Sequence, residues 1–144
     1  MRLWHYILIP VLPNKQLISQ WRECCAIAGE IAKYGSPRSP LTRKVVEYPI
    51  LHFSVYTNRV LAEMNRRGYE VDEKSYLRFV DNLNKGRENF NGNHDNMVII
   101  GALFPNWHND RYLSQCYYNL QEKYDCGMIP EDEWEKVENW PRYI

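Results

Sequence analysis

Apolar residues recur at helical spacing in the first third of the chain. From Lys15 to about Tyr34, the apolar and small side chains fall on one face at 100° per residue. Asn14 precedes this stretch and is expected to cap the helix, and the turn sequence "YGSP" ends it. The residues on the apolar face are Leu17, Trp21, Cys24, Cys25, Ala28, Ile31 and Ala32.

Two more helices are predicted before residue 90. One begins near Pro49, a residue favoured in the first helical turn, and ends at Gly68, a typical terminator. Asp72 is expected to cap the next one. Its apolar face carries Tyr76, Phe79, Val80 and Leu83.

The remaining chain is less regular. Residues 84–96 read "NKGRENFNGNHDN" and are expected to form a polar loop, whereas the buried segment 97–105 is too short for periodicity to separate helix from strand. Asp110 is expected to cap a helix that ends near Tyr124, and a short helix is expected from Pro130. The pattern predicts an all-α fold of about four to five helices in one domain, residues 1–144.

Composition narrows the class of protein. Hydrophobic residues make up 44% of the chain and aromatic residues 14%, which is typical of a globular domain. The longest apolar run, "MVIIGALF", is too short to span a bilayer. Two prolines interrupt the apolar N-terminus, and no small-residue cleavage site follows it. We therefore expect a cytoplasmic protein without a signal peptide or membrane span.

The cysteines and histidines show no metal-binding or disulfide pattern. The chain has no CxxC motif and no Cys/His cluster at zinc spacing, so we expect neither a metal nor another cofactor. Cys24 and Cys25 are adjacent on the apolar face and are expected to pack in the core. Phosphate-binding, zinc-protease and serine-hydrolase motifs are also missing.

Charge is distributed unevenly along the chain. Residues 1–90 hold 14 Lys and Arg against 9 Asp and Glu, whereas residues 91–144 hold 4 against 9. A basic region suits a nucleic-acid backbone, but an uneven surface without such a partner explains the charges equally well. Outside the apolar face, Glu23 lies with Ser19 and Glu30, and Arg22 lies beside Ala26 and Gly29. Their pattern alone favours a solvated pair.

Four sequence blocks, in order, resemble one known family. They are "MRLWH" at 1–5, "LPNKQLISQWRECCA" at 12–26, "LAEMNRRGYEV" at 61–71 and "HNDRYLSQCYYNLQEKY" at 108–124. Together they resemble the pyrimidine dimer DNA glycosylase family, of phage endonuclease V type, and within it a bacterial branch. The specificity of the resemblance comes from the terminal "MR" combined with "RE" about twenty residues later.

The resemblance implies a compact helical domain whose N-terminal segment packs among the helices. It also implies that the α-amino group of the first residue is the nucleophile. An α-amine has an ordinary pKa of about 7.7–8.0, against about 10.4 for lysine, so more of it is neutral near pH 7. Arg2 matches the arginine that follows the family's nucleophile, which assigns the amine to Met1. Arginine at this position is also expected to prevent removal of Met1.

The resemblance further implies a role for each of four other residues. Glu23 matches the family's catalytic glutamate, which stabilises positive charge on the sugar and assists removal of the C2′ proton. Arg2, Arg22 and Lys123 are expected to bind DNA phosphates. The implied function is that of a DNA repair glycosylase with AP-lyase activity on damaged or modified pyrimidines. Its expected partner is double-stranded DNA with a pyrimidine lesion or abasic site, bound by a monomer.

Some family residues are replaced in this chain. Gln16 stands in place of a histidine, and Ala26 and Asn119 in place of arginines. The acidic "PEDEWEKVENW" replaces an aromatic and basic C-terminal run. The alternative function is a non-catalytic helical module that binds nucleic acid or protein and keeps the family fold. A free Met1 amine close to Glu23 would favour the enzyme, whereas a terminus exposed to solvent would favour the binding module.

Overall fold

The computed structural model describes residues 1–92 and 102–141, and these contain α-helices and short 3-10 helices but no strand. The prediction of an all-α fold is therefore confirmed. None of the described helices combines the length and apolar character needed to cross a bilayer. In chain order the elements are η1 (Tyr6–Val11), α1 (Asn14–Tyr34), η2 (Arg43–Glu47), α2 (Ile50–Arg66), α3 (Glu73–Lys85), η3 (Arg87–Asn89), α4 (Asp110–Asp125) and α5 (Glu131–Glu138).

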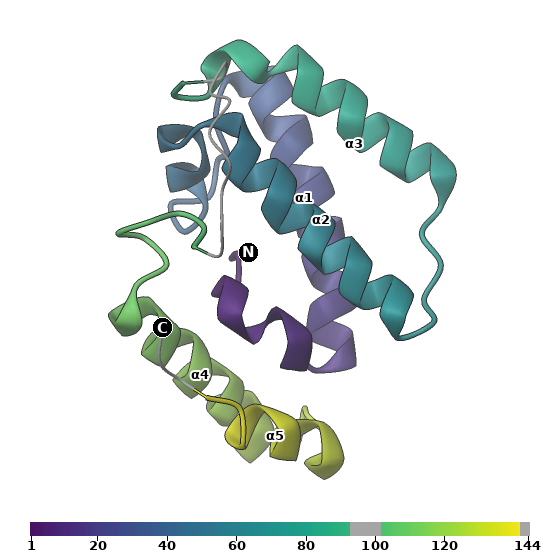
Figure 1. The fold of residues 1–144 in the computed structure, drawn as a ribbon, viewed down its shortest axis with the longest axis vertical. Coiled ribbons are helices and arrows are strands. Elements are labelled where there is room, and N and C mark those ends of the chain that lie inside the picture. The colour runs from purple at the N-terminus through teal and green to yellow at the C-terminus, as the bar shows by residue number, and fades with distance from the viewer. Residues whose placement is uncertain (93–101, 142–144) are drawn as a thin grey trace.

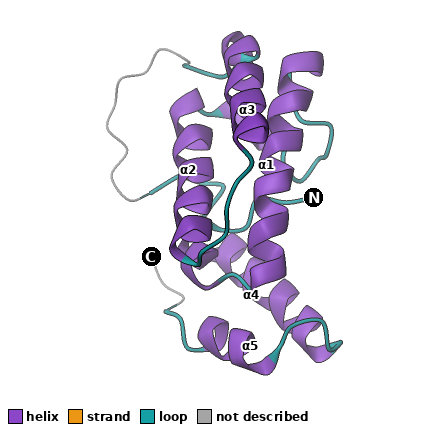
Figure 2. Cartoon of the chain, turned by 90° about the vertical axis from the view of Figure 1, so that its right-hand side faces the viewer, coloured by secondary structure: helices purple, strands orange, loops and turns teal. Residues whose placement is uncertain are grey.

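The helices form two groups with the start of the chain between them. Helices α1, α2 and α3 pack together, with α1 against both of the others (Figures 1 and 2). Helices α4 and α5 pack against each other, and η1 contacts both α2 and α5. In the core of the first group, Phe79 of α3 lies 5.6 Å from Trp21 and 5.8 Å from Phe53, measured between ring centroids.

The helix starts partly match the predictions. Asp72 caps α3 as expected, because its carboxylate accepts a hydrogen bond from the Ser75 backbone N–H at 3.2 Å. The prediction for Asp110 is wrong: this residue is already helical, and Asn109 caps α4 by accepting from Tyr112 N–H at 2.9 Å. The two residues have similar short side chains, and the one in extended conformation makes the cap.

Other boundaries shift by a few residues. Helix α2 begins at Ile50, directly after Pro49, and ends two residues before Gly68, whose φ of 87° suits glycine. The predicted loop 84–96 begins later than expected, because α3 reaches Lys85 and η3 follows it. Most of the segment 97–105 lies outside the described residues.

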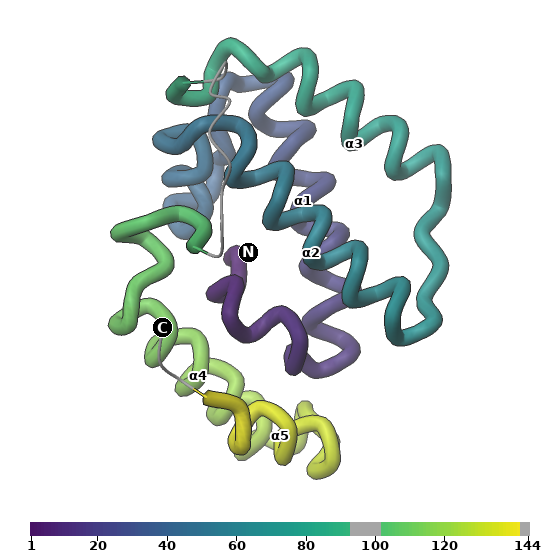
Figure 3. Tube along the Cα trace, viewed as in Figure 1, coloured from purple at the N-terminus to yellow at the C-terminus, as the bar shows by residue number. Residues whose placement is uncertain are grey.

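The N-terminal segment, residues 1–12, is largely buried. Its first part is extended, and η1 completes it. Figure 3 shows this segment between α4 and the pair formed by α1 and α2. The packing of the N-terminal segment among the helices, which the resemblance implied, is confirmed. Its most buried side chains are Leu3, Trp4, His5, Leu8, Ile9 and Leu12.

Side chains bond the backbone of the N-terminal segment, because no strand is paired with it. Buried backbone N–H and C=O groups need hydrogen-bond partners. The Trp4 C=O accepts from the Tyr56 hydroxyl at 2.6 Å, and the Leu3 C=O accepts from the Tyr112 hydroxyl at 2.6 Å. The Ile7 C=O accepts from the Trp140 indole N–H at 2.9 Å. Side chains from α2 and α4, and that of Trp140 after α5, thus hold this segment in place.

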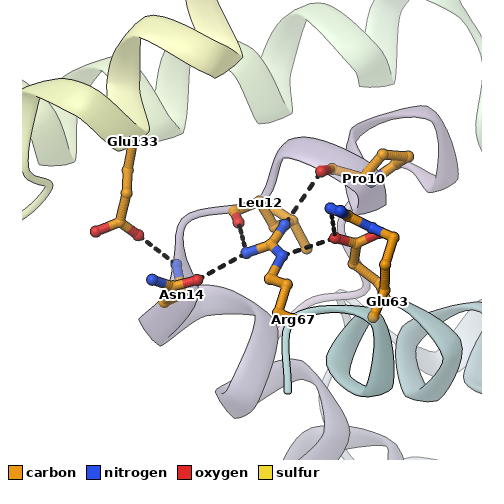
Figure 4. Close-up of polar contacts among 7 residues, drawn as sticks. Pro10, Leu12, Asn14, Glu63, Arg67 and Glu133 are labelled. Atoms are coloured by element: carbon orange, nitrogen blue, oxygen red, sulfur yellow. Dashed lines mark hydrogen bonds and ion pairs between the residues drawn. The ribbon is translucent and has the colours of Figure 1, made fainter. Parts of the chain in front are cut away.

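Arg67 fixes the end of the N-terminal segment (Figure 4). Its guanidinium donates to the Pro10 and Leu12 carbonyls at 3.1 and 2.7 Å, and to Glu63 at 2.7 Å. It also donates to the Asn14 side-chain oxygen at 2.9 Å. The prediction that Asn14 caps α1 is therefore wrong: Asn14 is the first helical residue, and its side chain is bonded to Arg67 instead.

Arg66 offers a matched comparison with Arg67, since both arginines pair with Glu63. Arg67→Ala should lower the free energy of unfolding by about 2–4 kcal/mol, because two backbone carbonyls lose a charged donor. Arg66→Ala should leave it nearly unchanged, because the Arg66 side chain is 67% exposed. Urea unfolding of the three proteins checks both expectations. Equal losses in the two variants would contradict this role of Arg67.

Two buried histidines also accept hydrogen bonds from backbone N–H groups of the N-terminal segment. His108 Nδ1 accepts from Tyr6 N–H, and His5 Nδ1 accepts from Ile7 N–H, both at 3.2 Å. A nitrogen that accepts carries no proton, so both rings are neutral. Burial lowers the pKa of His5 to about 4. Burial and the nearby His5 lower the pKa of His108 to about 2.

The histidines should make the protein sensitive to acid. In the unfolded chain a histidine has a pKa of about 6.5, so below that pH the unfolded state binds up to two protons that the folded state excludes. The free energy of unfolding should therefore fall as pH is lowered from about 6.5 toward about 4, by up to about 2.7 kcal/mol per pH unit. Urea unfolding between pH 7.5 and 5 measures this slope.

His108→Gln supplies the comparison, because an amide oxygen can still accept from Tyr6 N–H. About half of the slope should disappear in this variant. Other titrating groups are common to both proteins and cancel in the difference. An unchanged slope would show that His108 is not the group excluded from protonation.

Candidate functional site

The start of the chain is hydrogen-bonded to the carboxylate of Glu23. Helix α1 carries Gln20 and Glu23 on the side that faces the N-terminal segment, three residues apart and therefore neighbours on the helix surface. The Arg2 backbone N–H donates to Glu23 Oε2 at 3.4 Å, and Gln20 Nε2 donates to the same oxygen at 3.0 Å. These bonds hold the Glu23 carboxylate against the first residues of the chain.

The Met1 α-amine is one residue from the N–H that contacts Glu23. One residue spans at most about 3.6 Å, so the amine lies within about 7 Å of Glu23 Oε2. The described ion pairs join Glu63 to Arg66 and Arg67, and Asp81 to Lys85, so Met1 and Glu23 make no direct ion pair in this part of the chain. Met1 as a whole residue is 46% exposed. The amine is thus close to the Glu23 carboxylate, at the partly exposed start of the chain.

Burial changes the acidity of Glu23. The carboxyl group is partly removed from water, which raises its pKa above the ordinary value. The hydrogen bond from Arg2 N–H and the charge of the Met1 ammonium act in the opposite direction, as do Gln20 and the Arg2 guanidinium. The net shift is upward. A proton is therefore retained to a higher pH than on an exposed glutamate.

The other expected site residues are Arg2, Arg22 and Lys123. The Arg2 guanidinium lies over the Trp4 ring at 5.3 Å and donates to Cys116 Sγ on α4 at 3.9 Å. Arg22 is exposed on α1, next to Glu23 in sequence. Lys123 is half-buried on α4, seven residues and about 10 Å along the helix from Cys116. The structure thus brings Met1, Arg2 and Glu23 together, with Arg22 at the edge and Lys123 farther away.

Gln20 was missed by the sequence analysis. It is completely buried, and both its amide nitrogen and its amide oxygen are bonded. Besides its bond to Glu23, Nε2 donates to the Arg2 C=O at 2.9 Å, and Oε1 accepts from Trp4 N–H at 2.8 Å. The Tyr56 hydroxyl, which donates to the Trp4 C=O, lies 2.8 Å from the same Oε1. The available signal was a polar residue on the apolar face of the predicted helix, which is costly unless it is bonded.

The cysteines pack as predicted. Cys24 is completely buried, Cys25 is partly buried against the core, and neither forms a disulfide. Burial raises the pKa of both thiols, that of Cys25 to about 11, so neither is a thiolate near pH 7. Residues 1–92 and 102–141 contain no group of three or more His, Cys, Asp and Glu arranged to hold a metal. His94 lies outside the described residues.

A sizeable pocket lies away from this site. It has a volume of about 660 Å³ and is formed by η1, α2 and Trp140. Neither Met1 nor Glu23 lines it. Pockets of this size typically accept small ligands.

Comparison with known proteins identifies one family. The family model for pyrimidine dimer DNA glycosylase matches residues 1–77, just over half of the chain. The match includes Met1, Arg2, Arg22 and Glu23 but not Lys123. No curated protein and no solved structure gives a significant match. The matched region holds the buried N-terminal segment together with α1 and α2, and the chain belongs to the pyrimidine dimer DNA glycosylase family.

Proposed function

We propose that this protein is a DNA glycosylase with AP-lyase activity on damaged or modified pyrimidines, and that the Met1 α-amine is its nucleophile. The observation that carries this proposal is the hydrogen bond from the Arg2 backbone N–H to Glu23. This bond brings the terminal amine close to a carboxylate without a direct ion pair between them. Membership of a glycosylase family supports the same chemistry.

The proposed reaction has two stages. The neutral amine attacks C1′ of the target nucleotide, the N-glycosidic bond breaks, and the base leaves with the bonding electrons and gains a proton. Opening of the sugar ring gives a protonated Schiff base between C1′ and Met1. The Glu23 carboxylate then takes a proton from C2′, and the C3′–O bond breaks by β-elimination. Water finally hydrolyses the Schiff base and restores the amine.

The raised pKa of Glu23 gives the second stage a pH dependence. Only the carboxylate form can accept the C2′ proton. Because burial raises the pKa of Glu23, this form is lost at a higher pH than for an exposed glutamate. Strand cleavage should therefore decline on the acidic side before an ordinary glutamate would be protonated.

The substrate in this proposal is double-stranded DNA with a pyrimidine lesion or an abasic site. Access to C1′ requires local opening of the duplex or flipping of a nucleotide. Arg2 and Arg22 would bind phosphates beside the target, and Lys123 a phosphate farther along. We place this activity in the cytoplasm and expect the protein to act as a monomer.

Gln20 would position both reacting groups. The same amide nitrogen bonds the Arg2 C=O and the Glu23 carboxylate, so it links the nucleophile's segment to the proposed base. Gln20→Met should raise the pKa of Glu23 further, because the bond from Gln20 lowers it. Strand cleavage should fall roughly tenfold or more. NMR titration of the Glu23 carboxyl carbon and the pH profile of cleavage measure the two effects.

Gln16→Met is the matched control, since Gln16 lies one turn earlier on α1 and makes no described bond to Glu23. It should leave the pKa of Glu23 unchanged. A loss of stability alone would not shift this pKa, so the titration separates positioning from folding. The same Glu23 titration curve in all three proteins would contradict the role of Gln20.

The assignment of the nucleophile can be tested by borohydride trapping. Reduction should convert the Schiff base with abasic-site DNA into a stable covalent adduct. A protein with an uncleaved N-terminal tag should give no adduct, and proteolytic release of the native Met1 should restore it, because only then is the amine in place. Equal trapping before and after release would mean that a lysine reacts instead of Met1.

Glu23→Gln tests the second stage separately. The amide keeps the shape of the side chain but cannot accept the C2′ proton. Strand cleavage should fall by roughly 100-fold or more, while DNA binding persists. A wild-type protein that binds damaged DNA but neither traps nor cleaves it would instead support the non-catalytic binding module.

A further inference from the structure

A second pocket at the first turn of α4 combines two cations with several amides. It has a volume of about 260 Å³ and lies between the turn before η2 and the start of α4. This volume is below the usual range for drug-sized ligands and suits one small polar group. Among its lining residues are Lys44, Arg111, Asn106, Asn109 and Gln115.

The charged side chains that line this pocket are both cations, and neither is paired with a carboxylate within the described residues. Lys44 and Arg111 are both exposed. The described residues that line the pocket include no carboxylate. Four other pockets on the described surface each include at least one, such as Glu63, Glu73 or Glu133. The electrostatics of this pocket therefore favour an anion.

The walls of the pocket are anchored. Asn109 bonds two parts of one wall, since it accepts from Tyr112 N–H at 2.9 Å and donates to the Asn106 C=O at 2.8 Å. On the other side, Lys44 belongs to η2, whose Val45 is completely buried. Both cations thus extend from fixed backbone, which reduces the entropy lost when they bind a ligand.

Tyr112 connects the pocket to the start of the chain. This residue lines the pocket, and its hydroxyl donates to the Leu3 C=O at 2.6 Å. One turn farther along α4, Cys116 accepts from Arg2. Helix α4 thus contributes residues both to the pocket and to the packing around Arg2.

We propose that Lys44 and Arg111 bind a phosphodiester group of the DNA strand, a few nucleotides from the target. This inference rests on the proposed function, because it extends the same substrate beyond the candidate site. Such contacts fix the register of the DNA without reading its sequence.

The salt dependence of binding tests the proposal. The probe is a duplex with one tetrahydrofuran abasic analogue, which cannot form a Schiff base. The double variant Lys44→Ala, Arg111→Ala should weaken binding and reduce the slope of log K against log salt by up to about two. The control is Lys74→Ala, Lys85→Ala, which removes the same charge from α3, away from α4 (Figure 1). Its slope should match that of the wild type.

Neutral methylphosphonate linkages identify the phosphate. Placed one at a time around the analogue, they should weaken wild-type binding at one or two adjacent positions a few nucleotides away. At those positions the same linkages should not weaken DNA binding by the Lys44→Ala, Arg111→Ala protein any further. The proposal would be overturned if every methylphosphonate weakened binding by the double variant as much as it weakens binding by the wild type. An unchanged salt slope would overturn it as well. So would failure of the wild type to bind the duplex.

These measurements are independent of the chemistry. A wild type that shows the methylphosphonate pattern but is never trapped would refute the proposed lyase and leave the phosphate site intact. A trapped wild type without the pattern would refute only the phosphate site.

Discussion

The burial of the N-terminal segment without a partner strand is the constraint on which the rest of the structure depends. Each buried backbone N–H or C=O that lacked a partner would cost about 1–3 kcal/mol. The side chains of Gln20, Tyr56 and Tyr112 remove this cost along residues 2–4, from three different helices. Polar side chains in the centre of the domain are therefore part of its stability, and they fix where the chain begins.

The same bonds connect stability to the proposed chemistry. Gln20 is fully bonded only when the Arg2 carbonyl and the Glu23 carboxylate both lie within its reach. A segment that slipped along α1 would break these bonds and would also move the terminal amine away from Glu23. The position of the amine is thus maintained by the folding energy of the buried segment, rather than by a direct ion pair that would have to break before reaction.

Amphipathic periodicity was enough to predict the helices, because their apolar faces are long and regular. It was not enough for the N-terminal segment, whose run of apolar residues fits a strand, a helix or a signal sequence, and only the family resemblance placed it among the helices. The cap at Asp110 was misassigned because the neighbouring Asn109 offers the same chemistry. The cap at Asn14 was misassigned because only the tertiary structure shows that its side chain is bonded to Arg67. Gln20 was visible as a polar residue on an apolar face. The pairing of Lys44 with Arg111 could not be predicted from the sequence, because only the tertiary fold brings these distant residues to one pocket.

The acidic C-terminal run also has a structural role that sequence alone did not suggest. Asn14 N–H, at the start of α1, donates to the Glu133 carboxylate at 2.6 Å, so α5 supplies the cap that Pro13 cannot. A carboxylate there also opposes the positive end of the helix dipole. This position is nine residues, or about 13.5 Å along α1, from Glu23. Because that exceeds the screening length of about 8 Å at physiological salt, Glu133 should repel DNA at the candidate site only weakly. The placement of the charges, rather than their sum of zero, therefore decides whether this surface can hold DNA.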